Sequence, residues 1–228
     1  MKKTIAIGDV HGRTNWKDIV AQHPKDRIVF LGDYCDPYED VSNFHVLDNL
    51  LDIIKLKKER EDDVVLLLGN HDMHYLDPSF PQGTRYNDGI APMITSLLEE
   101  SRDSFQFAYQ EDMTLFTHAG LSQNWWLFDF KGTEGDEGRS IADQLNHPTP
   151  EQLKAMYQVG LSRGGSSLRG GIFWADARDT SRDPLQDVHQ VVGHTQMDSI
   201  LIVSPSESTS ITFCDCLRYG DYYQKAGR

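Results

Sequence analysis

Five short apolar segments in this chain each end abruptly in a small cluster of Gly, Asp, Asn and His. This recurring pattern constrains the fold more than any other feature of the sequence. The segments are residues 4–7, 27–31, 64–68, 113–116 and 188–192. Runs this short and this continuously apolar predict strands that are buried on both faces. Strands of that kind occur mainly in α/β proteins, where helices cover a parallel sheet.

Stretches with helical spacing of apolar residues lie between these segments. Ser42 is a predicted N-cap for a helix whose apolar stripe runs through Phe44, Leu47, Leu51 and Ile54. A second stripe is formed by Ile90, Met93, Ile94, Leu97 and Leu98. Residues 149–152 read as a capping box with Pro at the first helical position, and Gly160 as the end of that helix. We expect all three stretches to pack on the core.

The end of the chain has a different pattern. Segments 200–203 and 210–214 are separated by a polar loop and predict a hairpin. Strands that alternate with helices and are followed by a run of strands predict two packed mixed β-sheets flanked by helices. We expect a single domain over residues 1–228, with a small cap or insertion at about 121–170. The composition, 39% hydrophobic and 25% charged, is typical of a soluble globular protein.

The charge and the N-terminus exclude several classes of protein. A formal net charge of −13 argues against nucleic-acid binding, which needs a basic surface, although a metal centre can still attract a phosphate. The apolar stretch after Met1 covers only residues 5–7, so we expect no signal sequence and no membrane span. Three cysteines without a CxxC motif suit a reducing compartment, and we expect a cytoplasmic protein.

All five predicted strands end in side chains that bind metals. Ligands of open α/β sheets gather at the carboxyl ends of the strands, and Asp, Asn and His offer oxygen and nitrogen atoms to divalent cations. One such cluster is weak support, because Gly-Asp is usually a turn and a lone His is more often structural. Packing does not require metal ligands after five successive strands, so the set predicts a metal site.

These clusters resemble the motif set of the calcineurin-like metallophosphoesterase superfamily. The similarity is to its phosphoprotein phosphatase branch, which includes serine/threonine phosphatases and diadenosine tetraphosphate hydrolases. The matching motifs are residues 8–12 (GDVHG), 32–36 (GDYCD), 69–72 (GNHD), 118–120 (HAG), 173–176 (FWAD) and 193–194 (GH).

The resemblance implies a dinuclear metal centre. Its six metal ligands would be Asp9, His11, Asp33, Asn70, His118 and His194. Asp9 and His11 would bind the first cation, Asp33 would bridge both, and the other three would complete the second site. His71 matches the histidine that protonates the leaving oxygen, and Asp36 matches the carboxylate that orients it. A carboxylate suits the bridging role because it can span two ions about 3.5–4 Å apart.

The implied activity is hydrolysis of a phosphate ester by in-line attack of a hydroxide that bridges two divalent cations. The mixed ligand set suits Mn, which we expect, and also Fe, Zn, Ni or Co. The substrate stays open between a phosphoprotein, a bis(5′-nucleosyl) polyphosphate and a small phosphodiester. A noncatalytic module that binds metal and phosphate is a remote alternative, disfavoured because His71 and Asp36 are both present. The acidic composition disfavours a nuclease.

The second motif departs from the family pattern, which usually continues from Asp36 into an Arg-Gly pair whose arginine grips the phosphate. Here residues 37–39 are Pro-Tyr-Glu, so phosphate recognition comes from elsewhere or is weaker. The candidate replacements are Arg163, Arg169 and Arg182, with Arg85 and Arg178 as further options. The Gly/Ser-rich run 164–167 is either a loop over the site or an ordinary surface loop.

Two further features have packing interpretations. Residues 121–147 have the weakest secondary-structure pattern of the chain. The aromatic run 125–130 within them either stacks on a substrate ring or covers the edge of the core. Cys35 lies inside the second motif, and we interpret it as a packing residue rather than a nucleophile.

Overall fold

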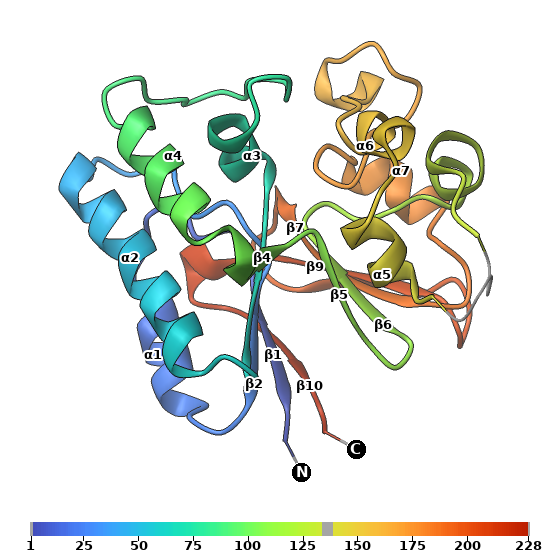
Figure 1. Ribbon diagram of the computed structural model, residues 1–228. Coiled ribbons are helices and arrows are strands. Elements are labelled where there is room, and N and C mark those ends of the chain that lie inside the picture. The colour runs from blue at the N-terminus through green and yellow to red at the C-terminus, as the bar shows by residue number, and fades with distance from the viewer. Residues whose placement is uncertain (1, 134–138, 228) are drawn as a thin grey trace.

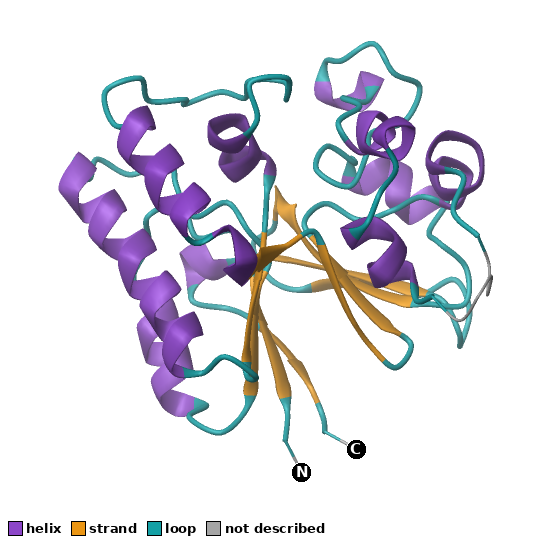
Figure 2. Cartoon of the chain, in the orientation of Figure 1, coloured by secondary structure: helices purple, strands orange, loops and turns teal. Residues whose placement is uncertain are grey.

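Two sheets packed face to face form the centre of the molecule. The computed structural model describes residues 2–133 and 139–227, and within these ranges ten strands form two five-stranded sheets. The order is β10-β1-β2-β3-β4 in the first sheet and β5-β6-β7-β9-β8 in the second. Each sheet mixes parallel and antiparallel pairs. Figure 2 shows helices outside both sheets, so the predicted fold class is confirmed.

The first sheet contains β1 (Thr4–Ile7), β2 (Arg27–Phe30), β3 (Val64–Leu67), β4 (Phe105–Gln106) and β10 (Tyr223–Lys225). The second contains β5 (Ala108–Glu111), β6 (Thr114–Thr117), β7 (His189–Gln196), β8 (Leu201–Val203) and β9 (Ser210–Asp215). All five predicted strands are present, and the predicted hairpin is the antiparallel pair of β8 and β9. The sequence did not predict β4, β5 or β10.

The helices are α1 (Trp16–Gln22), α2 (Asn43–Glu59), α3 (Asn70–Leu76), α4 (Ala91–Glu100), α5 (Ile141–Asn146), α6 (Pro150–Met156) and α7 (Ala177–Arg182). Short 3-10 turns are η1 (Arg102–Ser104), η4 (Leu161–Arg163) and η5 (Leu217–Tyr219), and η2 (Trp125–Phe130) is a π-helical turn. Figure 1 shows α1, α2 and α4 outside the first sheet and α5, α6 and α7 beside the second. None of the helices in the described ranges is long and apolar enough to cross a membrane.

Two apolar layers hold the sheets and helices together. Successive side chains of a strand point to opposite faces, so each central strand contributes to both layers. The helix-facing layer includes Ile5, Ile7, Ile28, Phe30, Val64 and Leu66. The layer between the sheets includes Ala6, Val29, Leu31, Val65, Leu67, Phe116 and Val191. The central strands are therefore buried on both faces, as their apolar sequences predicted.

The predicted stripe of α2 is wrong at two positions. Ser42 does cap the helix, since its Oγ accepts a hydrogen bond from the His45 amide at 3.2 Å. Phe44 and Leu51, however, are 80% and 45% exposed. At 100° per residue the buried face centres on Val46, Leu50 and Ile53, and Phe44 and Leu51 lie beyond its edge. In α4, Met93 is likewise exposed, whereas Ile94 and Leu98 are buried.

The capping box of α6 is confirmed. Thr149 Oγ1 accepts from the Gln152 amide at 3.3 Å, and Gln152 Oε1 accepts from the Thr149 amide at 2.9 Å. The helix ends at Met156, before the predicted stop at Gly160, and a loop follows.

The aromatic run 125–130 is largely part of the core. Trp125, Trp126 and Phe130 are buried, and both indole rings stack on Phe130 at about 5 Å. The packing interpretation therefore holds for these three, while Phe128 is exposed. Residues 134–138 of the range 121–147 lie outside the described residues. A capping role for about 121–170 stays a prediction.

Candidate metal centre

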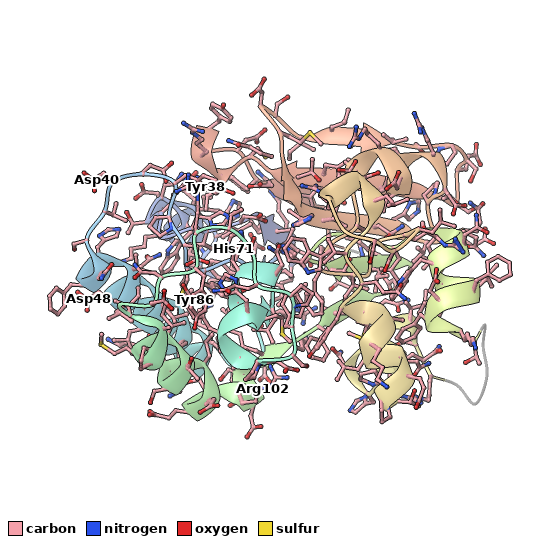
Figure 3. All side chains as sticks on the ribbon, turned by 90° about the horizontal axis from the view of Figure 1, so that it is seen from above. Tyr38, Asp40, Asp48, His71, Tyr86 and Arg102 are labelled. Carbon is pink, nitrogen blue, oxygen red and sulfur yellow. The ribbon has the colours of Figure 1, made fainter. Side chains whose placement is uncertain are left out.

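The turns that leave both sheets converge on one place. Asp9 follows β1, Asp33 follows β2, and Asn70 and His71 begin α3 directly after β3. His118 follows β6 in the second sheet. Seen from above in Figure 3, His71 lies near the middle of the molecule, between the blue and green half and the yellow and orange half. The candidate site therefore lies where the two sheets meet.

His194 reaches the site in an unexpected way. The sequence predicted a strand that ends before Gly193, but β7 continues to Gln196. Its pairing with β9 shifts register between Val192 and Gln196, so His194 lies in a bulge-like irregularity of the strand. A bulge bends the strand and redirects a side chain, which is how a residue inside β7 contributes to the site.

Four of the predicted site residues have a left-handed backbone. Their φ angles are 46° at His11, 53° at Asp33, 58° at Asp36 and 63° at His194. Such conformations are disfavoured for residues other than Gly and concentrate at functional sites. They allow the chain to turn sharply as it leaves each strand, so that the side chains point inward.

The carboxylates of Asp33 and Asp9 each accept a backbone hydrogen bond through one oxygen. Asp33 Oδ1 accepts from the His71 amide at 2.8 Å, and Asp9 Oδ1 accepts from the His194 amide at 2.9 Å. A Cβ atom at Gly69 would lie 2.1 Å from Asp33 Oδ1, and one at Gly193 would lie 2.3 Å from Asp9 Oδ1. Glycine is therefore required at position 69, where the backbone of Asp33 is also 2.7 Å away, and a side chain at position 193 would displace the Asp9 carboxylate. The second oxygen of Asp33 faces other side chains, and the Asp9 side chain also contacts Asp215.

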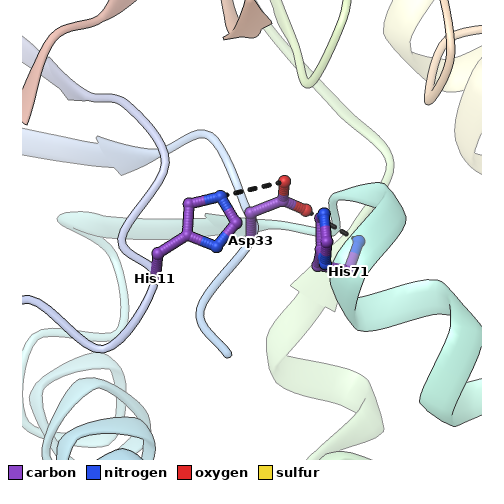
Figure 4. Close-up of side chains that lie close together, drawn as sticks. All are labelled: His11, Asp33 and His71. Carbon is purple, nitrogen blue, oxygen red and sulfur yellow. Dashed lines mark hydrogen bonds and ion pairs between the residues drawn. The ribbon is translucent and has the colours of Figure 1, made fainter. Parts of the chain in front are cut away.

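Asp33 Oδ2 lies between histidines of the two sheets. It is 3.6 Å from His11 Nε2 and 3.5 Å from His118 Nε2. Figure 4 shows the contact of Asp33 with His11 and the hydrogen bond from the His71 amide to the other oxygen, Oδ1. Asp9 Oδ2 is 3.8 Å from His11 Nε2. Asn70 Oδ1 and His194 Nδ1 lie 2.9 and 3.2 Å from His118 Nε2. Two groups of potential ligands, His11–Asp33–His71 and Asp33–His118–His194, therefore share the carboxylate of Asp33, and its bridging of two cations stays a prediction.

Hydrogen bonds fix the tautomers of two histidines. His11 Nδ1–H donates to the carbonyls of Cys35 and Asp36 at 2.9 and 3.0 Å, and His118 Nδ1–H donates to the Leu31 carbonyl at 2.8 Å. In the neutral rings both Nε2 atoms are therefore unprotonated and face the carboxylates. This second-layer arrangement is typical of metal-binding histidines. His118 Nε2 also faces Asn70 Oδ1, and these lone pairs repel unless a cation lies between them.

The electrostatics of the donor set also fit cations. Burial raises the pKa of Asp9 and of Asp33 well above the usual value. Burial lowers the pKa of His11 and of His118 to about 3, and that of His194 well below its usual value. The histidines are thus neutral and able to act as ligands, and the buried carboxylates need a positive partner. His194 Nε2 is buried and has no hydrogen-bond partner among the described residues. The residues present therefore fit divalent cations.

His71 and Asp36 form a buried pair beside these ligands. His71 Nδ1–H donates to Asp36 Oδ2 at 2.8 Å, and the His71 ring lies 5.0 Å from the ring of His11. Burial raises the pKa of Asp36, but hydrogen bonds from His71, His74 and Tyr75 outweigh it, and the net pKa lies below the usual value. Asp36 is therefore a carboxylate at neutral pH. It can orient the His71 ring so that His71 Nε2 faces the site.

One of the three predicted arginines lies in the pocket over these residues. Arg163 lines it, together with Tyr38 and Trp174. Arg169 instead pairs with Asp129 at 2.9 Å, and neither it nor Arg182 is among the pocket-lining residues in the described ranges. Arg85 stacks on the Tyr38 ring at 4.3 Å, and Arg178 pairs with Asp176. The run 164–167 is a turn held by backbone hydrogen bonds to residues 159–161.

Sequence reasoning missed several residues of this region. Arg13 lines the pocket and immediately follows the first motif, and Asp215 lines it from the end of β9. Asp72 accepts three backbone N–H groups at 2.7–2.9 Å and thereby ties the turn after β2 to the start of α3. His74 contacts Asp36 from one helical turn beyond His71, a spacing that could have marked it. Cys35 is buried and burial raises its pKa, in agreement with a packing role.

This fold and donor set define a class of metal-dependent enzymes that act on phosphate esters. A sequence profile of calcineurin-like phosphoesterases matches residues 2–214, and the chain belongs to that family. The predicted family is thereby confirmed, and it is a family of phosphoester hydrolases.

Among curated proteins, a symmetrical bis(5′-nucleosyl)-tetraphosphatase from Marinomonas sp. (strain MWYL1) is 29% identical over 136 residues. The match covers 54% of this chain and 46% of the relative, so it spans about half the length of that relative.

Two solved structures show the same fold. A cold-active protein-tyrosine phosphatase of a psychrophilic Shewanella species superposes with a TM-score of 0.57, at 18% identity, over 95% of this chain and 71% of that one. A protein serine/threonine phosphatase from Saccharomyces cerevisiae superposes with a TM-score of 0.53, at 18% identity, over 93% and 67%. At this identity the likeness concerns the fold alone.

Proposed function

We propose that the protein is a phosphoesterase that uses two divalent cations, preferably Mn²⁺, to hydrolyse a phosphate ester. The observation that carries the proposal is Asp33 Oδ2, which lies between His11 and His118 while the His71–Asp36 pair stands beside it. Asp9 and His11 would hold one cation, and Asp33 would hold both. The remaining ligands of the second cation would be Asn70, His118 and His194. When bound, the cations polarise the phosphoryl oxygens and make hydroxide available near neutral pH.

His71 has the role of general acid in this proposal. As the bond between phosphorus and the leaving oxygen breaks, the proton on His71 Nε2 moves to that oxygen, and the hydroxyl that has added to phosphorus stays on the released phosphate. Asp36 holds Nδ1–H at 2.8 Å, fixes the ring and stabilises the imidazolium that precedes proton transfer.

Arg13 and Arg163 would bind the phosphate in place of the arginine that is absent after Asp36. Arg13 pairs with Glu39 through Nε at 3.2 Å, and Arg163 pairs with Asp176 through Nε at 3.1 Å. These carboxylates fix each guanidinium by one edge. An arginine carries five N–H donors, so each retains donors that can bind phosphate oxygens.

The first candidate substrate is a phosphomonoester such as a phosphoprotein, and the second is a bis(5′-nucleosyl) polyphosphate. The Marinomonas relative favours the second, and so do the aromatic walls of the pocket, Tyr38 and Trp174, which offer ring faces for stacking on a base.

Metal reconstitution tests the proposal. Chelator-stripped protein is reloaded with Mn²⁺ and assayed on p-nitrophenyl phosphate, bis(p-nitrophenyl) phosphate, a phosphopeptide and diadenosine tetraphosphate. We expect turnover to vanish on stripping and to return on reloading. His71→Ala should retain its metal but lose turnover of the phosphopeptide, whose alkoxide leaving group needs a proton, by about 100-fold or more, with a smaller loss on the p-nitrophenyl esters. Metal-loaded protein that binds phosphate but turns over none of the four would instead indicate a noncatalytic binding module. Cleavage of single-stranded DNA would indicate a nuclease.

A further inference from the structure

Asp36 receives contacts from three side chains, and only one of them belongs to the proposed acid. Oδ2 lies 2.8 Å from His71 Nδ1 and also 2.8 Å from His74 Nε2. Oδ1 accepts from the Tyr75 hydroxyl at 2.5 Å. His71, His74 and Tyr75 all lie on α3, spaced so that they share one face of the helix. The proposed catalytic pair is therefore part of a four-residue buried group.

The protonation of His74 follows from its two neighbours. The Gly83 amide donates to His74 Nδ1 at 3.3 Å, so Nδ1 carries a lone pair. The proton of the neutral ring is then on Nε2, where it faces Asp36 Oδ2. A proton is needed there, because two lone pairs 2.8 Å apart would repel. Nε2 is buried, and its contact with Asp36 Oδ2 is short but is not aligned as a regular hydrogen bond.

Tyr75 is oriented in the same way. The Asn87 amide donates to the Tyr75 hydroxyl at 3.0 Å, which directs the hydroxyl proton toward Asp36. The rings of Tyr75 and His74 both pack on Tyr86, at 4.7 and 5.0 Å. The segment from Gly83 to Asn87 includes the pocket-lining Thr84. Its backbone amides orient the polar groups of His74 and Tyr75 that face Asp36.

We propose that His74 is a positioning residue for the acid step: it holds Asp36 in the orientation that accepts His71 Nδ1–H. A carboxylate held only by His71 could rotate when that ring moves toward the leaving group. Two further donors on a buried helix face keep Oδ2 in place while His71 transfers its proton, which is the pre-organisation that catalysis requires. This inference rests on the proposed function of the site.

Leaving-group dependence tests the inference. His74→Leu removes the donor, whereas His74→Gln retains an N–H close to the position of Nε2. With Mn²⁺-loaded protein, we expect His74→Leu to lower kcat for phenyl phosphate by about 10-fold and to leave p-nitrophenyl phosphate nearly unchanged, since p-nitrophenolate departs without a proton. KM should change little, and His74→Gln should recover most of kcat. An equal loss on both substrates, or no loss on either, overturns the inference.

A readout independent of turnover is the ¹⁵N NMR spectrum of the imidazoles in protein loaded with diamagnetic Zn²⁺. We expect a neutral His74 protonated on Nε2, and a His71 Nδ1–H that exchanges with water faster in His74→Leu than in the wild type. A His74 protonated on Nδ1, or an unchanged exchange rate, contradicts the inference. If the Leu variant does not fold, His74→Asn, whose amide is too short to reach Asp36, replaces it. Wild-type protein that shows these signals but hydrolyses no phosphate ester would refute the proposed function and leave the positioning intact.

Discussion

Arg163 and Arg178 offer a matched pair of variants, because both bind the same carboxylate from opposite sides. Asp176 is buried, and its oxygens lie 3.1 Å from Arg163 Nε and 2.9 Å from Arg178 Nε. Arg163 lines the pocket with a side chain 24% exposed, whereas Arg178 is 69% exposed and outside it. When either arginine is truncated to alanine, Asp176 keeps its ion pair with the other arginine. Each variant should therefore lose only about 1 kcal/mol of unfolding free energy or less.

The effect of the two truncations on catalysis should differ. A hydrogen bond from a charged group to phosphate contributes about 1.5–3 kcal/mol, so Arg163→Ala should lower kcat/KM by about 10- to 150-fold. Arg178→Ala should leave kcat/KM unchanged. The assay is hydrolysis of p-nitrophenyl phosphate by Mn²⁺-loaded protein, with urea unfolding as the stability control. Equal losses in both variants, or full activity in Arg163→Ala, would refute a phosphate-binding role for Arg163.

Three further predictions concern the same region. Arg13→Ala should raise KM for a dianionic phosphomonoester more than for a monoanionic diester, because the substitution removes a positive charge from the pocket. Equal increases of KM for both substrates in steady-state assays would contradict a phosphate-binding role for Arg13. Asp72→Ala leaves three buried amides without an acceptor and should lower the unfolding free energy by about 3–5 kcal/mol in urea titrations, with Asp72→Asn milder. In the absence of cations burial raises the pKa of Asp9 and of Asp33, so cations must displace protons. Metal affinity measured by calorimetry should therefore increase as the pH rises above the usual range of a carboxyl group, and a flat profile would contradict the assigned ligands.

The central strands and the cluster of candidate ligands were predictable because each depends on local sequence. A strand buried on both faces must be apolar throughout, as residues 64–67 are. A chain leaving such a strand needs a sharp turn, as at Gly32, where φ is 104°. The ligands follow those turns, so the position of Asp33 in the sequence already indicated its place in the fold. His194 was assigned from its motif, although the bulge that directs it inward depends on pairing with β9.

Features that depend on distant partners were not predictable. β10 is a polar segment that becomes a strand only because the edge of β1 is available for pairing. The exposure of Phe44 depends on which face of α2 meets the sheet, and two neighbouring faces of that helix have similar apolar spacing. Arg163 and Arg169 look alike in sequence, but Asp129 holds Arg169 away from the pocket while Asp176 holds Arg163 within it.

A titration of Mn²⁺ into metal-stripped protein, with bound metal and turnover recorded together, tests the central claim most directly. Two cations that share Asp33 should bind per chain, and turnover should appear only as the second is bound. Asp33→Asn should bind fewer than two and stay inactive, because a neutral amide does not easily bridge two cations. Full turnover with a single bound cation, or in Asp33→Asn, would contradict the dinuclear centre.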